Sequence, residues 1–253
     1  MNRINQLFQD KPSNICSVFI TAGYPELKST VEKVLELEQS GADMIELGIP
    51  FSDPLADGET IQETSSVALE NGMNLSILFD QVSEIRAQSE IPIVLMGYLN
   101  PILKFGLEDF LTECEKKGVD GLIIPDISLE EYELNYQEVM TTYNVPLTFL
   151  VTPKTSTDRL RRIVGHTKSF IYYVSSASTT GKTQGYSEEQ VQAFKAYQAL
   201  QIHQPTLMGF GIHDKETFDT ACKFFNGGII GSAYLRSIKS GVSSERFLLD
   251  ILE

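Results

Sequence analysis

Two carboxylates close together in the chain, Glu46 and Asp57, are the first candidates for chemistry. Residues 44–49 form an apolar run with Glu46 in its middle, and a loop bracketed by prolines then leads to Asp57. If the run is a strand, alternate side chains share a face, so Glu46 lies on the same face as Met44. An acid that points into a barrel loses its water and needs a reason to be there. Two carboxylates at the carboxyl end of one strand suit proton transfer.

The residues alone leave alternatives open for both acids. Asp53 lies in the same loop as Asp57, and acids in loops are commonly solvated or form turns. For Glu46 the alternative is a structural acid that pairs with a buried lysine or arginine. None of the eight predicted strands contains either residue type, which favours a catalytic acid. The same absence argues against an aldolase that forms a Schiff base.

Glycines in three loops predict a phosphate site. They are Gly209 and Gly211 after one strand, Gly231 with Ser232 before the helix predicted at 233–238, and Gly181 within the polar segment 176–187. Glycine lets backbone N–H groups approach an oxyanion, and a helix N-terminus adds a favourable dipole. Any one of these glycines could simply end a strand. Barrel enzymes often hold phosphate at these loops, so the set favours phosphate, and segment 176–187 is interpreted as a mobile lid.

A tyrosine on the sixth predicted strand could add a hydroxyl to the same site. Tyr172 shares a face with Phe170 and Val174 and lies near the carboxyl end of that strand. The alternative is an ordinary core tyrosine. The three histidines are scattered along the chain and form neither a metal-binding set nor a Ser-His-Asp arrangement.

The elements that would position these residues alternate between strand and helix. Strands are predicted at 17–21, 44–49, 91–97, 121–124, 147–151, 170–174, 206–210 and 228–231, and helices at 2–10, 27–40, 60–70, 76–87, 107–117, 158–164, 188–201, 233–238 and about 247–251. The pattern predicts an α/β fold, a (β/α)8 TIM barrel formed by residues 1–253 as one domain, with a short N-terminal helix capping its floor. A doubly wound open sheet is the alternative, but no Gly-x-Gly-x-x-Gly follows the first strand.

Composition narrows the classes of function. The net charge of −14 argues against binding nucleic acid or an anionic membrane surface. Three widely spaced cysteines suggest reduced thiols, and no stretch has the length of a signal core or a membrane span. These features predict a cytoplasmic protein. Any phosphate must be held by local contacts, because the overall field of the protein repels anions.

Six segments resemble the tryptophan synthase α subunit family. They are Phe-Ile-Thr-Ala-Gly-Tyr-Pro (19–25), Glu-Leu-Gly-Ile-Pro-Phe-Ser-Asp-Pro-Leu-Ala-Asp-Gly (46–58), Met-Gly-Tyr-Leu-Asn-Pro (96–101), Pro-Asp-Ile-Ser-Leu-Glu-Glu (125–131), Gly-Phe-Gly-Ile (209–212) and Gly-Ile-Ile-Gly-Ser-Ala (228–233). They span the first to the eighth strand, and the segment 46–58 is the most specific.

The resemblance implies a retro-aldol cleavage of indole-3-glycerol phosphate to indole and glyceraldehyde 3-phosphate. It assigns the general acid/base to Glu46 and the acceptor of the indole N–H to Asp57. The substrate-binding residues that it implies are Phe19, Met96, Tyr172, Thr180, Gly181, Gly211, Gly231 and Ser232. It implies no metal or cofactor in this chain. Indole would pass to a β subunit that holds pyridoxal phosphate, in an α2β2 assembly docked through Asp53, Pro54 and the segment around Asn100.

The segment 175–181 departs from the family pattern. Ser176 stands where the family often has arginine and Ser178 where it has glycine, while Glu59 and Ser128 replace prolines. These departures leave two other hypotheses: a regulatory subunit with little activity of its own, and a lyase that works without a partner.

Overall fold

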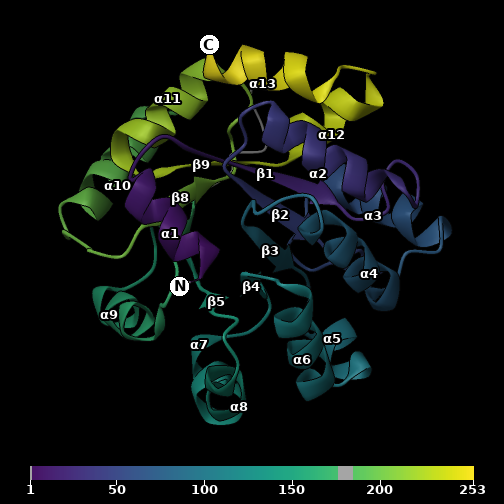
Figure 1. Ribbon diagram of the computed structural model, residues 1–253. Coiled ribbons are helices and arrows are strands. Elements are labelled where there is room, and N and C mark those ends of the chain that lie inside the picture. Colours follow the sequence, from purple (N-terminus) through teal and green to yellow (C-terminus); the bar gives the residue numbers. More distant parts are fainter. Residues whose placement is uncertain (1, 176–184) are drawn as a thin grey trace.

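The computed structural model describes residues 2–175 and 185–253, whose strands form one parallel sheet wrapped into a barrel (Figure 1). The strands are β1 (Ile15–Thr21), β2 (Met44–Gly48), β3 (Ile93–Met96), β4 (Gly121–Ile123), β5 (Leu147–Thr148), β6 (Leu150–Val151), β7 (Ile171–Val174), β8 (Thr206–Gly209) and β9 (Gly227–Ile230). Their order is β5-β4-β3-β2-β1-β9-β8-β7-β6, so consecutive strands lie side by side except β5 and β6, and β1 also lies beside β9. The predicted (β/α)8 barrel is confirmed.

One predicted strand, residues 147–151, is divided in the structure. Its first half, β5, pairs with β4, and its second half, β6, pairs with β7. Phe149 separates the halves, and its carbonyl still accepts a hydrogen bond of 3.0 Å from the Tyr172 N–H. The Phe149 ring is buried against Tyr132, with the ring centroids 5.1 Å apart. The wall of the barrel therefore continues through the break.

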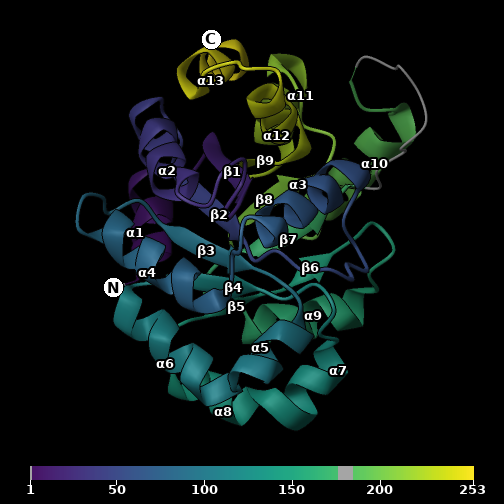
Figure 2. The same cartoon turned by 90° about the vertical axis from the view of Figure 1, so that its right-hand side faces the viewer.

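Helices cover the outside of the barrel and, at one end, its floor (Figures 1 and 2). They are α1 (Arg3–Asp10), α2 (Ser29–Gln39), α3 (Glu59–Glu70), α4 (Leu75–Arg86), α5 (Leu99–Phe105), α6 (Leu107–Lys117), α7 (Leu129–Glu131), the π-helix η1 (Tyr132–Tyr136), α8 (Gln137–Thr142), α9 (Thr157–His166), α10 (Glu188–Gln198), α11 (Lys215–Phe224), α12 (Ser232–Lys239) and α13 (Ser244–Leu252). All the predicted helices are present. The helical segments α5, 129–142 and α11 are additional. Within the described ranges, no helix is long and apolar enough to cross a membrane.

Alternation along the strands separates two cores. Met44 belongs to the cluster inside the barrel, whereas Ile45 and Leu47 belong to the cluster between the sheet and the helices. Helix α1 closes the floor, because its Ile4 and Phe8 side chains belong to the inner cluster. In Figure 1 this helix crosses in front of the strands. The predicted inward face of β2 and the N-terminal cap are both confirmed.

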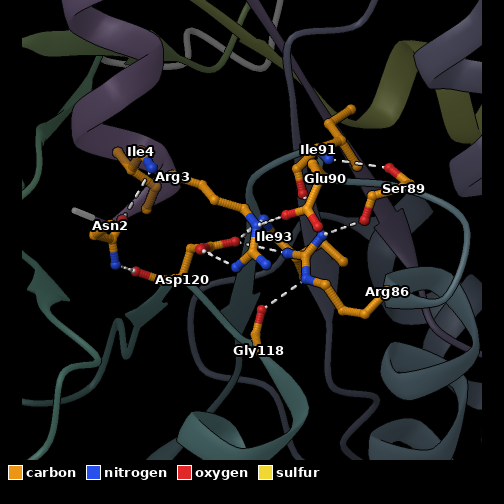
Figure 3. A network of polar contacts seen from close by, with 10 residues as sticks. All are labelled: Asn2, Arg3, Ile4, Arg86, Ser89, Glu90, Ile91, Ile93, Gly118 and Asp120. Atoms are coloured by element: carbon orange, nitrogen blue, oxygen red, sulfur yellow. Dashed lines mark hydrogen bonds and ion pairs between the residues drawn. The ribbon is translucent and has the colours of Figure 1, made fainter.

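A buried carboxylate ties α1 to the floor of the barrel (Figure 3). Asp120 accepts hydrogen bonds from Arg86 at 2.6 Å, from Arg3 at 3.1 Å and from the Ile93 N–H at 2.9 Å. The Asn2 side chain donates to the Asp120 carbonyl at 2.7 Å. Because the Asp120 side chain is only 3% exposed, these contacts neutralise a charge that would otherwise be costly to bury.

Asp120 is joined to Ile93 of the neighbouring strand by two hydrogen bonds, one through its side chain and one through its N–H, and the same pair of bonds recurs elsewhere on the floor. Asp43 accepts from the Cys16 N–H at 2.8 Å, and the Asp43 N–H donates to the Cys16 carbonyl at 2.8 Å. Asn226 makes the equivalent pair with Thr206. Asp120 and Ile93 complete the set. These paired hydrogen bonds explain why an aspartate, in Gly-x-Asp, precedes both β2 and β4 in the sequence. They also hold the starts of neighbouring strands in register.

Candidate active site

Glu46 is fully buried on the inner face of the barrel. It lies in register between Phe19 of β1 and Val94 of β3, and Val94 belongs to the inner core cluster. Neither carboxyl oxygen has a hydrogen-bond partner in the part of the chain that the structure describes. Burial raises the pKa of Glu46 from 4.5 to about 8. The group is therefore mostly protonated at neutral pH and can donate a proton.

The path of the loop from β2 to α3 gives Asp53 and Asp57 different surroundings, a difference that the residues alone could not predict. Asp57 is half-buried and faces a small pocket that Phe19 and Met96 also line. Burial raises the pKa of Asp57, and the Tyr98 hydroxyl acts against that rise. Asp53 is exposed and faces a different groove. The geometry thus brings Asp57, and not Asp53, into the pocket lined by Phe19, the residue in register with Glu46.

The pocket is lined chiefly by apolar and aromatic side chains. Its lining includes Phe19, Ile49, Asp57, Ile61, Met96 and Tyr98. Phe19 and Met96, the two residues predicted to pack against indole, therefore both line this pocket. A carboxylate among apolar groups matches the chemistry of a flat aromatic ring with one hydrogen-bond donor, but the free volume of about 10 Å³ is too small for that ring, so side chains must move before it can enter.

Tyr172 lies on β7, the strand next to β8 and its glycines. It is 4% exposed and belongs to the inner core cluster. Its pKa is raised well above the usual range, first by burial and then by the charges of Glu46 and Asp57. On the neighbouring strand, a Cβ at Gly209 would lie 2.1 Å from this hydroxyl. Gly209 is therefore needed to make room for Tyr172.

The end of β8 and the start of α12 form the polar end of the site. Gly211 has φ +81°, and Phe210 before it has φ +72°, a conformation rare for a bulky residue. The Ser175 hydroxyl donates to the Phe210 carbonyl at 2.8 Å and supports this turn. Gly231 caps α12 without a side-chain hydrogen bond, and Ser232 is the first helical residue. The first N–H groups of α12 thus have no capping side chain and can bind an anion.

Two of the predicted substrate-binding residues lie outside the described residues. These are Thr180 and Gly181, together with the altered positions Ser176 and Ser178 of the predicted lid. In the ranges that the structure covers, no group of three His, Cys, Asp or Glu side chains is arranged to hold a metal ion.

Two site residues were missed by the sequence reasoning. Tyr98 lines the pocket beside Asp57, and the Phe210 ring lies 6.4 Å from that of Tyr172. The signal for Tyr98 was its place at the carboxyl end of a predicted strand, where barrel enzymes place functional residues. Phe210 was counted as the last residue of a strand, and its positive φ could not be read from the residue type.

Comparison with known proteins decides the family. A family model described as the tryptophan synthase alpha chain matches residues 6–251. The tryptophan synthase alpha chain of Flavobacterium psychrophilum is 47% identical over 99% of this chain and 100% of its own length. This chain belongs to the tryptophan synthase alpha chain family. The family's member from Christiangramia forsetii is 48% identical over 96% of this chain and 95% of its own.

Solved structures of the family share the fold. The tryptophan synthase alpha chain from Legionella pneumophila superposes with a TM-score of 0.87 at 31% identity, over 100% of this chain and 95% of that one. The tryptophan synthase complex from Pyrococcus furiosus gives 0.80 at 35% identity, over 94% and 95%. As a member of this family, the chain is a carbon–carbon lyase that cleaves indole-3-glycerol phosphate to indole and glyceraldehyde 3-phosphate.

Proposed function

We propose that Glu46 and Asp57 divide the proton transfers of this cleavage between them. The Glu46 carboxyl donates its proton to C3 of the indole ring, which leaves the ring nitrogen positively charged. The Asp57 carboxylate accepts a hydrogen bond from the ring N–H and stabilises that charge. The Glu46 carboxylate then takes the proton of the hydroxyl on the carbon attached to C3. As that carbon becomes the aldehyde, the electrons of the broken C–C bond restore the indole ring.

The rest of the site would orient the substrate. Phe19 and Met96 pack against the indole ring, with Tyr172 at the border between the ring and the glycerol chain. The phosphate would be bound at the other end by backbone N–H groups, because that end offers glycines and an uncapped helix start. The residues proposed for this role are Gly211, Gly231 and Ser232, with Thr180 and Gly181 contributed by segment 176–187.

One observation carries the proposal: among the described residues the Glu46 carboxyl is buried without a hydrogen-bond partner, in register with Phe19, which lines the pocket that contains Asp57. A carboxyl so placed destabilises the fold when it ionises, so its presence calls for a function. Its raised pKa, about 8, supplies the protonated form that the first step requires.

We further propose that the chain works with a β subunit in an α2β2 assembly in the cytoplasm. The β subunit would hold pyridoxal phosphate and convert the released indole to tryptophan. Asp53 and Asn100, two of the predicted docking residues, line one groove together with Leu75 and Phe105. Leu55, close to Pro54 in the same loop, is 82% exposed. Exposed apolar surface of this kind is typical of an interface.

The test is indole release by the wild type, Glu46→Gln and Asp57→Asn, each with and without a β subunit. Each variant should lose activity by a factor of about 10² or more, the usual contribution of a positioned acid or base. Both should keep the wild-type circular dichroism spectrum and still bind the β subunit in size-exclusion chromatography. Wild-type turnover by Glu46→Gln would refute the assignment of the acid/base.

The same experiment separates the other two hypotheses. A wild-type chain that activates the β subunit but releases no indole in either state would indicate a regulatory subunit. A chain that releases indole at full rate and elutes separately from the β subunit would indicate a lyase that works without a partner.

A further inference from the structure

Tyr98 connects the loop that carries Asp57 to a rigid part of the barrel. It directly precedes α5 and is 4% exposed. Its hydroxyl accepts a hydrogen bond of 3.0 Å from the Ala56 N–H, and its ring lies 5.5 Å from that of Phe51. Tyr98 therefore contacts the β2–α3 loop at two points, one of them a residue before Asp57.

The backbone at Tyr98 is itself held in place. The next N–H along the chain, that of Leu99, donates to both oxygens of Asp126 in the loop after β4, at 3.0 and 3.2 Å. By contrast, most residues from Ser52 to Gly58 are exposed and contribute little to packing. The hydroxyl thus joins an exposed loop to a residue whose neighbouring backbone is hydrogen-bonded to Asp126.

The Tyr98 hydroxyl can also donate a hydrogen bond, and the Asp57 carboxylate is the acceptor that we consider. Once the Tyr98 oxygen has accepted the Ala56 N–H, its own proton remains free to be donated. Asp57 directly follows Ala56 and lines the same pocket as Tyr98, and each group is among the causes of the other's pKa shift. A donated hydrogen bond favours the ionised carboxylate, and it therefore opposes the rise in the Asp57 pKa that burial causes.

We propose that Tyr98 is a positioning residue of the lyase reaction, whose hydroxyl holds the Asp57 carboxylate toward the ring N–H of the substrate. This inference rests on the proposed role of Asp57. The hydroxyl fixes the direction of the carboxylate and keeps it ionised, which is the form that can accept the indole N–H. A tyrosine needed only for packing would use its ring alone, and phenylalanine would replace it without loss.

The test is Tyr98→Phe, which keeps the ring against Phe51 and removes only the hydroxyl. We expect kcat/KM for indole release to fall about tenfold, the scale of one charge-assisted hydrogen bond. The acidic limb of the kcat/KM profile should move to higher pH, because burial of Asp57 is then unopposed. Tyr143→Phe, a hydroxyl deletion on the far side of α6, is the matched control and should change neither quantity.

Binding of indole provides a second measurement that needs no turnover. Tyr98→Phe should weaken indole binding where Asp57 is present and leave it unchanged in the Asp57→Asn background. Equal weakening in both backgrounds would overturn the inference, and so would a wild-type pH profile for Tyr98→Phe alongside an inactive Asp57→Asn. An active Asp57→Asn would instead refute the proposed function itself.

Discussion

Glu46→Gln should make the protein more stable, and increasingly so as the pH rises. The folded state holds a proton on Glu46 up to a pKa of about 8, whereas the ordinary value in an unfolded chain is 4.5. Between these values the folded state binds more protons than the unfolded state. The stability of the wild type therefore falls from about pH 4.5 to about pH 8 and then levels off. Glutamine does not titrate and escapes this loss.

The size of the effect follows from the shift in pKa. A rise from 4.5 to about 8, at about 1.4 kcal/mol per unit, corresponds to about 5 kcal/mol once the carboxyl is fully ionised in both states. That figure is an upper limit, because water that enters the barrel mouth relieves part of the desolvation. Between pH 6 and pH 9, the stability difference between Glu46→Gln and the wild type should grow by about 3 kcal/mol.

The assay is urea unfolding of the wild type and Glu46→Gln at several values from pH 5.5 to pH 9. Loss of near-ultraviolet circular dichroism is the signal, because chains of this length often unfold through intermediates. Glu138→Gln, at an exposed helical position, is the control for removing a surface carboxylate. A stability difference between Glu46→Gln and the wild type that stays constant over the whole range would refute the reasoning. It would mean that Glu46 ionises alike in both states.

Two further predictions concern packing and charge. Gly209→Ala should lower stability by about 1–3 kcal/mol and impair indole release, because its Cβ would lie 2.1 Å from the Tyr172 hydroxyl. Gly231→Ala, whose Cβ would meet its nearest neighbour at 3.6 Å, should raise KM while the urea midpoint stays near that of the wild type. A lower urea midpoint for Gly231→Ala than for Gly209→Ala would contradict the packing described at both glycines. Asp120→Asn should lower stability by about 3–5 kcal/mol, because it leaves buried arginine charge unpaired. Glu63→Gln, which breaks an exposed ion pair, should lower stability by at most about 1 kcal/mol. Equal urea midpoints for Asp120→Asn and Glu63→Gln would refute the stated difference between the buried and the exposed ion pair.

Most of the barrel could be predicted because its elements carry strong local signals. The odd acid in an apolar run identified both β2 and its inward face. The exceptions have specific causes. Helix α5 was not predicted; its Pro101 is tolerated because it lies in the first helical turn, where the missing N–H has no partner. The division at Phe149 depends on packing against Tyr132, a contact that joins residues far apart in the chain.

In the candidate site, too, sequence could not predict what depends on contacts between residues far apart in the chain. Sequence alone could not choose between Asp53 and Asp57, because the choice depends on the path of one loop. The position of Tyr98 was, in principle, within reach. Neighbouring strands in a (β/α)8 barrel pair in chain order, and the observed pairing of Gly48 with Met96 brings the loops after β2 and β3 together. What composition and spacing could not supply is the direction of the Tyr98 hydroxyl. That direction distinguishes a residue that merely fills space beside Asp57 from one that orients it.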